Sequence, residues 1–192
     1  MRQMRNHALL VVAALIASLS VALLVIKYPL LNAAEALIAR IEGVYTRSHE
    51  VSAVDGGVET AEDVVEIVRY DATHVFVQIM ARFDNGHSCG LSGIAPFEDE
   101  SFVYRTRQFI LDGEPTCTIK VQLTGDELRI TDRLKPNGTA TCSGFCGARG
   151  NLSDFAIARR QRRPIQDPTI LKGSAAFAAA VEEFTKDTMV RK

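Results

Sequence analysis

The sequence contains no tryptophan, has aromatic residues at only 7% of its positions, and carries almost no net charge, with 22 Lys and Arg against 23 Asp and Glu in 192 residues. Without an overall basic excess it lacks the electrostatic signature of a dedicated nucleic-acid-binding protein. Glycine and proline are scarce, at 13 and 6 residues, whereas hydrophobic residues make up 47%. This balance excludes a disordered, collagen-like or low-complexity chain. The length fits one ordinary domain with extensions, or two very small ones.

The near-zero net charge is the average of three segments that differ in sign. Residues 1–42 carry four basic and two acidic side chains, residues 43–158 carry ten and seventeen, and residues 159–192 carry eight and four. The chain is therefore an acidic middle between two basic ends. Such asymmetry is typical of proteins that meet a charged partner or a membrane, and an ordinary solvated surface is the alternative.

The most distinctive feature is an uncharged run near the N-terminus, Ala8–Ile26. A helix of this length spans about 28 Å, close to the thickness of the hydrocarbon core. Arg2 and Arg5 precede the run, and basic residues on that side place the N-terminus in the cytoplasm and the rest of the chain outside it. We therefore predict a signal-anchor over residues 1–28, in a single-pass inner-membrane protein whose bulk lies in the periplasm.

A cleaved signal peptide is the alternative, because Ser20-Val21-Ala22 has the small-x-small pattern of a cleavage site. Cleavage would release a secreted, periplasmic protein. The apolar run continues through Leu23–Ile26, where a signal peptide normally turns polar, so the uncleaved anchor is favoured. Ala14, Ser18 and Ala22 recur four residues apart. Small residues at this spacing let two membrane helices approach closely, which would join two copies of the chain as a homo-oligomer.

Two segments show the apolar periodicity of amphipathic helices. The first, residues 29–42, begins at Pro29 and is predicted either to lie at the membrane surface or to pack on the domain that follows. The second, residues 169–190, is predicted to pack on that domain or on the first helix, and docking onto another protein is the alternative. Its apolar stripe consists of Ile170, Phe177, Val181 and Phe184.

Between these helices the apolar period changes to two, which is typical of strands with one buried face. The clearest case is Thr116–Leu123, where Cys117 and Ile119 fall on one face and polar residues on the other. Residues 43–158 are therefore predicted to form a mainly β domain, a small antiparallel β-barrel of about eight strands. The acidic stretch Val51–Asp63 is expected to be its most mobile loop. The predicted strands are Gly43–Ser48, Val64–Tyr70, His74–Phe83, Ser88–Ala95, Phe102–Leu111, Thr116–Leu123, Leu128–Thr131 and Asp154–Ala158.

All four cysteines, Cys89, Cys117, Cys142 and Cys146, follow the predicted membrane segment, where an oxidising compartment would join them in disulfide bonds. Four cysteines allow three pairings. We expect Cys89–Cys117 and Cys142–Cys146, because Cys89 and Cys117 fall in strands that are expected to be neighbours. A zinc site is the alternative, with Cys142 and Cys146 as half of it and His87 near Cys89, although the spacing is not the usual C-x2-C.

One motif resembles a known pattern. Thr141–Phe155, with the sequence TCSGFCGARGNLSDF, resembles the closing C-G-x-Y-C-G-x-R-A-x-F-x-G-x-Y segment of small exported bacterial β-domains. Related segments occur in proteins grouped loosely with periplasmic lysozyme inhibitors, in which Gly-Val-Tyr, here Gly43-Val44-Tyr45, opens the first strand. The resemblance implies an exported β-domain that inhibits a cell-wall lytic enzyme. An acidic middle segment is consistent with this, since it would speed encounter with a basic enzyme.

After the last predicted strand, a basic linker over residues 159–168 contains Arg159, Arg160, Arg162 and Arg163. This run is predicted to bind anionic lipid headgroups at a membrane surface, and a plain soluble linker is the alternative. None of the four histidines belongs to a nucleophile elbow, a His-Glu-x-x-His site or a phosphate loop. We therefore predict no catalytic residue, no metal or other cofactor, and no enzymatic activity.

Together these features predict a membrane-tethered periplasmic binding or inhibitory module, directed at a protein partner such as a lysozyme-like enzyme. A structural subunit of a bacterial envelope complex, joined through its membrane and terminal helices, is the second hypothesis. The third is an uncharacterised enzyme whose active residues come together only in three dimensions.

Overall fold

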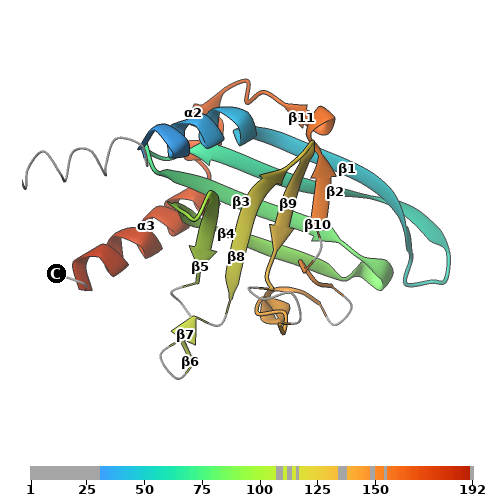
Figure 1. Ribbon diagram of the computed structural model, residues 1–192. Coiled ribbons are helices and arrows are strands. Elements are labelled where there is room, and N and C mark those ends of the chain that lie inside the picture. Colours follow the sequence, from blue (N-terminus) through green and yellow to red (C-terminus); the bar gives the residue numbers. More distant parts are fainter. Residues whose placement is uncertain are drawn as a thin grey trace, which may run out of the picture.

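One nine-stranded antiparallel sheet forms the centre of the computed structural model, which describes residues 31–106, 110–111, 114–115, 117–133, 138–147, 150–153 and 155–190. The strands follow the order β10-β9-β8-β5-β4-β3-β2-β1-β11, and the sheet curls into a nearly closed barrel (Figure 1). A separate small hairpin contains β6 and β7. The strands are β1 (Gly43–Ser52), β2 (Val58–Arg69), β3 (His74–Arg82), β4 (Ser88–Glu98), β5 (Ser101–Arg105), β6 (Ile110–Leu111), β7 (Glu114–Pro115), β8 (Thr118–Thr124), β9 (Glu127–Thr131), β10 (Phe155–Ala158) and β11 (Arg162–Arg163).

The barrel wall follows from the alternation of side chains in the sequence. In β3, Val75, Val77 and Ile79 are buried in the main core, because successive residues of a strand point to opposite faces. The predicted mainly β antiparallel barrel is confirmed, and seven of the eight predicted strands each overlap one observed strand. The prediction of Phe102–Leu111 as a single strand is wrong, because its two ends belong to β5 and β6, which lie in different sheets. The sheet has nine strands rather than about eight. The additional strand, β11, comes from the segment predicted as a linker and pairs with Val44 and Tyr45.

The expectation of a mobile loop over Val51–Asp63 is wrong. These residues belong to a long hairpin in which β1 and β2 remain paired from Gly43 opposite Ile67 to Ser52 opposite Val58, so that only residues 53–57 form the turn. The acidic residues suggested a loop, but β2 is already paired with β1 here, and alternate residues are buried from Ala61 onward, beginning with Ala61 and Asp63. Figure 1 shows the hairpin extending to the lower right, beyond the neighbouring strands.

The helix over residues 31–41 closes one end of the barrel. Its buried residues, Ala34, Leu37, Ile38 and Ile41, recur at helical spacing, and the last three belong to the same apolar core as the inward side chains of the strands. The Tyr45 hydroxyl donates a 2.8 Å hydrogen bond to the carbonyl oxygen of Ile41. Of the two predicted positions for this helix, the structure therefore shows packing on the barrel.

The C-terminal helical region is divided rather than continuous. Helix α2 (Pro168–Lys172) ends at Gly173, and α3 (Ala175–Val190) begins where the Ser174 hydroxyl accepts a hydrogen bond from the backbone N–H of Phe177. Such a serine caps the start of a helix, which makes a new helix favourable there. The predicted stripe is broken accordingly, since Ile170 is 73% exposed.

Helix α3 covers the outer face of the sheet. Phe177, Val181 and Phe184 pack against an apolar patch that includes Phe76 of β3 and Ile94 of β4. The rings of Phe177 and Phe76 meet edge to face, with their centroids 5.1 Å apart. The predicted packing of this helix on the barrel is therefore confirmed. Among the described residues, no helix has both the length and the apolar character needed to cross a membrane, and the predicted span, Ala8–Ile26, precedes the first described residue.

A side chain of β1 reaches across the seam of the curled sheet to the edge strand β10. Arg47 of β1 donates hydrogen bonds of 3.0 and 2.7 Å to Asp63 of β2, and a third of 3.0 Å to the carbonyl oxygen of Ala156 in β10. Its guanidinium also lies 4.7 Å from the ring centroid of Phe155. The side chain of Asp63 is only 1% exposed, and its second oxygen accepts from the backbone N–H of Arg82. Arg47 thus closes the barrel while neutralising a buried carboxylate.

Replacing Arg47 by glutamine is expected to lower the free energy of unfolding by about 2 to 3 kcal/mol, because it removes the guanidinium from the buried Asp63 carboxylate and leaves only the His49 ring, 3.5 Å away, beside it. Chemical denaturation of the two proteins measures this difference. Arg129→Gln is the matched control, because Arg129 pairs with Glu127 on the surface and such pairs contribute less than about 1 kcal/mol. Equal losses in the two variants would show that Arg47 has no special part in closing the barrel.

Candidate functional site

The structure joins all four cysteines in two disulfide bonds, as predicted, but not in the predicted pairs. The bonds are Cys89–Cys146 and Cys117–Cys142. No free cysteine remains, so none of these thiols is available for the zinc site that was the alternative. Within the described residues, moreover, no three His, Cys, Asp or Glu side chains are grouped so as to hold a metal ion.

A short turn explains the corrected pairing. Cys142 and Cys146 flank the single turn η2 (Ser143–Phe145), which directs them to different strands. Cys146 forms a β-bridge with Cys89 of β4, while the backbone next to Cys142 is held at β8, where the Thr141 hydroxyl accepts from the backbone N–H of Thr118. The bonds enclose sequence separations of 57 and 25 residues. The chain-entropy model assigns bonds of this kind about 4 and about 3.5 kcal/mol of stability.

Non-reducing peptide mapping tests this connectivity sharply. Trypsin leaves Cys142 and Cys146 on one peptide, because no Lys or Arg separates them. The structure therefore predicts that this peptide stays linked to both the Cys89 peptide and the Cys117 peptide. A further cut after Phe145 should leave Cys146 with Cys89 and Cys142 with Cys117. A tryptic pair that contains only Cys89 and Cys117 would contradict the structure.

The four arginines of the predicted membrane-binding run are held in different ways. Arg162 turns toward the helix over residues 31–41, where its Nη1 donates a 2.7 Å hydrogen bond to the carbonyl oxygen of Arg40. It thereby caps the C-terminal end of that helix, where carbonyl groups otherwise lack partners. Arg160 and Arg163 are exposed, and Arg159 is half-buried. Arg162 therefore has a structural contact, and the other three side chains are available at the surface.

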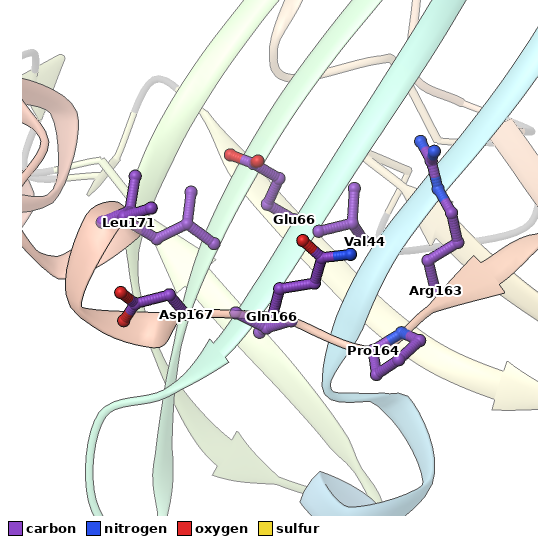
Figure 2. Close-up of a pocket in the computed structure, with 9 residues that line it drawn as sticks. Val44, Glu66, Arg163, Pro164, Gln166, Asp167 and Leu171 are labelled. Carbon is purple, nitrogen blue, oxygen red and sulfur yellow. The ribbon is translucent and has the colours of Figure 1, made fainter.

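Sequence reasoning missed a groove on the outer face of the barrel. Figure 2 shows Val44 of β1 and Glu66 of β2 on one side of it, and Pro164, Gln166 and Leu171 from the following chain and α2 around the rest. The groove has a volume of about 360 Å³. We call it the Glu66 groove. Its complete lining is Val44, Glu66, Arg163, Pro164, Ile165, Gln166, Asp167, Ile170 and Leu171.

Glu66 is the chemically distinctive residue of this groove. Burial raises the pKa of its carboxyl group above the ordinary value, because the charged form loses part of its hydration. Among the described residues, no arginine, lysine or hydrogen-bond donor holds this carboxylate, whereas Asp167, the other acid of the groove, caps α2 through Thr169. The lining around Glu66 includes the apolar side chains of Val44, Ile165 and Leu171. A cationic group with an apolar stem would match both properties.

The signal that could have located Glu66 is partial. Alternation in β2 places Glu66 on the outer face, opposite the inward Val65 and Ile67. Nothing in the sequence indicates that residues 163–171 return beside this part of the sheet, because that return depends on the pairing of β11 with β1. The predicted strand Val64–Tyr70 therefore gave the face but not the groove.

Glu66→Gln is expected to stabilise the protein at neutral pH. Because the pKa of Glu66 is higher in the folded state than in the unfolded state, its ionisation destabilises the fold as the pH rises through that interval. The glutamine variant removes this loss, so the gain should disappear below the ordinary pKa of a carboxyl group. Melting curves across this pH range measure it. Glu62→Gln, at an exposed position of the same strand, is the control and should show a smaller change.

Comparison with known proteins finds no match for this chain: no family model, no curated sequence and no solved structure is significantly similar to it. The motif in Thr141–Phe155 therefore stays a resemblance, and the inhibitor function that it implies is a proposal. The described part of this segment contains both cysteines that close the disulfide bonds with β4 and the start of β8.

Proposed function

We propose that this protein is a binding module of the bacterial cell envelope, which captures a basic protein partner through the Glu66 groove. Residues 1–28 anchor it in the inner membrane, and the barrel lies in the periplasm. The two disulfide bonds support the second statement, because such bonds persist in oxidising compartments and are rare in the cytosol. The uncharged run Ala8–Ile26 supports the first.

The observation that carries the proposal is the Glu66 carboxylate, which forms no ion pair or hydrogen bond with any described residue, although Arg163 lines the same groove. A carboxylate that loses hydration without gaining a cation reduces the stability of the free protein. A lysine or arginine of a partner would restore the missing counter-charge, and its hydrocarbon stem would cover the apolar lining. The groove is therefore better suited to a bound basic side chain than to open solvent.

The charge of the whole barrel segment points to the same class of partner. Residues 43–158 carry ten basic and seventeen acidic side chains, so the long-range field attracts basic proteins. Lysozyme-like enzymes of the cell wall are basic, and the Thr141–Phe155 resemblance implies such a target. We therefore propose a cell-wall lytic enzyme as the partner and inhibition of that enzyme as the outcome of binding.

The test uses the full chain in detergent and a purified basic lysozyme as the probe. Calorimetry measures the dissociation constant, and hydrolysis of cell walls measures inhibition. Glu66→Gln should weaken binding by about tenfold or more, because a buried interfacial charge would lose its partner. Glu62→Gln should have a smaller effect, since Glu62 is exposed and is not part of the groove. Rising salt should weaken binding by the wild type and by both variants, because it screens charge attraction.

Two outcomes would contradict the proposal in different ways. Equal affinity of the wild-type chain and the Glu66→Gln variant would remove the Glu66 groove from the binding surface. Absence of any binding or inhibition of the lysozyme would reject a lytic enzyme as the partner, while the pH dependence of stability would still report whether Glu66 is desolvated in the free protein.

A further inference from the structure

The end of the barrel that carries the helix over residues 31–41 also carries the arginine-rich segment. Arg162 of β11 contacts the carbonyl oxygen of Arg40 at the end of this helix, and Arg163 stands opposite Val44 at the start of β1. Figure 1 shows the helix and the segment from η3 (Arg159–Gln161) to α2 along the upper edge of the barrel. Two stretches far apart in the sequence therefore place basic residues at the same end of the molecule.

Four of these basic side chains form what we call the basic rim: Arg40, Arg159, Arg160 and Arg163. Arg159 and Arg160 line a hollow of about 340 Å³ together with Asp126 and Ala158. Within the described part of the chain, none of the four arginines forms an ion pair with a carboxylate, and Arg163 has only a long contact of 3.5 Å with the hydroxyl of Thr46. Arg40, Arg160 and Arg163 are exposed.

Most of the acidic side chains close to the basic rim are already engaged. Glu42 accepts a hydrogen bond from the backbone N–H of Arg69, Glu127 is paired with Arg129, and Asp167 caps helix α2. Asp126 stands in the hollow itself, and Glu66 lies in the groove beside Arg163. Four guanidinium groups thus face two carboxylates that are not held elsewhere. The rim keeps a positive field on a barrel segment that is acidic as a whole.

The basic rim lies near the part of the chain that follows the predicted membrane anchor. Thirty residues precede the helix over 31–41, and they include the uncharged run Ala8–Ile26. The helix is about 16 Å long. The rim at its C-terminal end therefore lies only about this far from residue 31, where the chain arrives from the predicted membrane anchor. The exposed residues of the helix include three small ones, Ala33, Ala36 and Ala39, which would allow close approach to a flat surface. Its one exposed acid, Glu35, is paired with Arg69 at 3.5 Å.

We propose that the basic rim binds the anionic phosphate headgroups of the bilayer in which the chain is anchored. The barrel would then lie with its helix-capped end on the membrane. Guanidinium groups suit this role because they donate paired hydrogen bonds to phosphate oxygens and stay charged. The inference rests on the membrane anchor of the proposed function but not on the Glu66 groove. The rim differs from the arginine run of the sequence. Arg162 is left out because it caps a helix, and Arg40 is included because the fold brings it to the same end of the barrel.

The absence of tryptophan from the chain supplies a clean reporter. Ala39→Trp places one indole on the exposed face of the helix, next to Arg40. The full-length variant is reconstituted in vesicles of phosphatidylcholine alone or mixed with phosphatidylglycerol, both with dansyl-labelled headgroups. Energy transfer from the indole to dansyl should rise when phosphatidylglycerol is present and fall again in high salt.

A second variant replaces all four arginines of the basic rim by glutamine in the Ala39→Trp background. It should lose the rise caused by phosphatidylglycerol, whereas a control with Arg82→Gln and Arg133→Gln, two exposed arginines outside the rim, should retain it. A third protein carries its only tryptophan at Val54, which is 81% exposed in the turn of the hairpin, about 30 Å along β1 from the rim. It should show little transfer in either lipid.

Each result decides the matter. A rise of about fivefold or more in the fraction of barrels held at the surface, lost in the rim variant, supports the proposal. Equal transfer in both lipids overturns it, and so does loss of transfer on adding inorganic phosphate at matched ionic strength, which would identify a soluble phosphate as the ligand. Flotation of the full chain with the vesicles tests the anchor separately. Failure to float rejects the tether, and flotation without lipid-dependent transfer rejects only the rim.

Discussion

The seam of the barrel is closed around a buried carboxylate and the cation that reaches it. Asp63 lies in the interior, at the inner face of β2, where an unpaired charge would be costly. Arg47 satisfies it from the neighbouring strand and continues to the carbonyl oxygen of Ala156 on the opposite edge of the sheet. The same guanidinium therefore pairs a charge and holds two edges together. An apolar pair at these positions could fill the space but would give the edges no specific contact.

The remaining closure is made by covalent and capping contacts around the two ends. The disulfide bonds attach the irregular chain around η2 to β4 and to the residue before β8. This chain leads into β10, so the bonds fix the position from which β10 returns to the seam. At the other end, Arg162 holds the last turn of the helix over residues 31–41 while its own strand pairs with β1. Because the helix fills the barrel mouth, loss of this cap would expose apolar core as well as unpaired carbonyl groups.

The sequence was informative where one local rule decided the outcome. Alternation located seven of the eight predicted strands, and the spacing of Phe177, Val181 and Phe184 identified the docked face of α3. Sequence reasoning failed where contacts between distant residues determined the structure. The cysteine pairing depended on the direction of one turn between Cys142 and Cys146, and no local rule gives that direction. The hairpin beyond Val51 was missed because its acidic residues suggested a loop, although Ala61 and Asp63 are inward positions of β2.

The arginine run shows why charge in a sequence has to be separated by geometry before it is assigned a role. Arg162 and Arg163 are adjacent, yet β11 turns the first toward the helix and leaves the second at the surface, because successive residues of a strand point to opposite faces. The same strand brings residues 164–171 back over β1 and β2 and so creates the Glu66 groove. The two-residue pairing of β11 therefore contributes to both surfaces, since it positions the lining of the Glu66 groove and places Arg163 in the basic rim. A change that breaks the pairing of β11 with β1 would disturb both surfaces at once. A change to Glu66 would alter only the groove, and a change to Arg160 would alter only the rim.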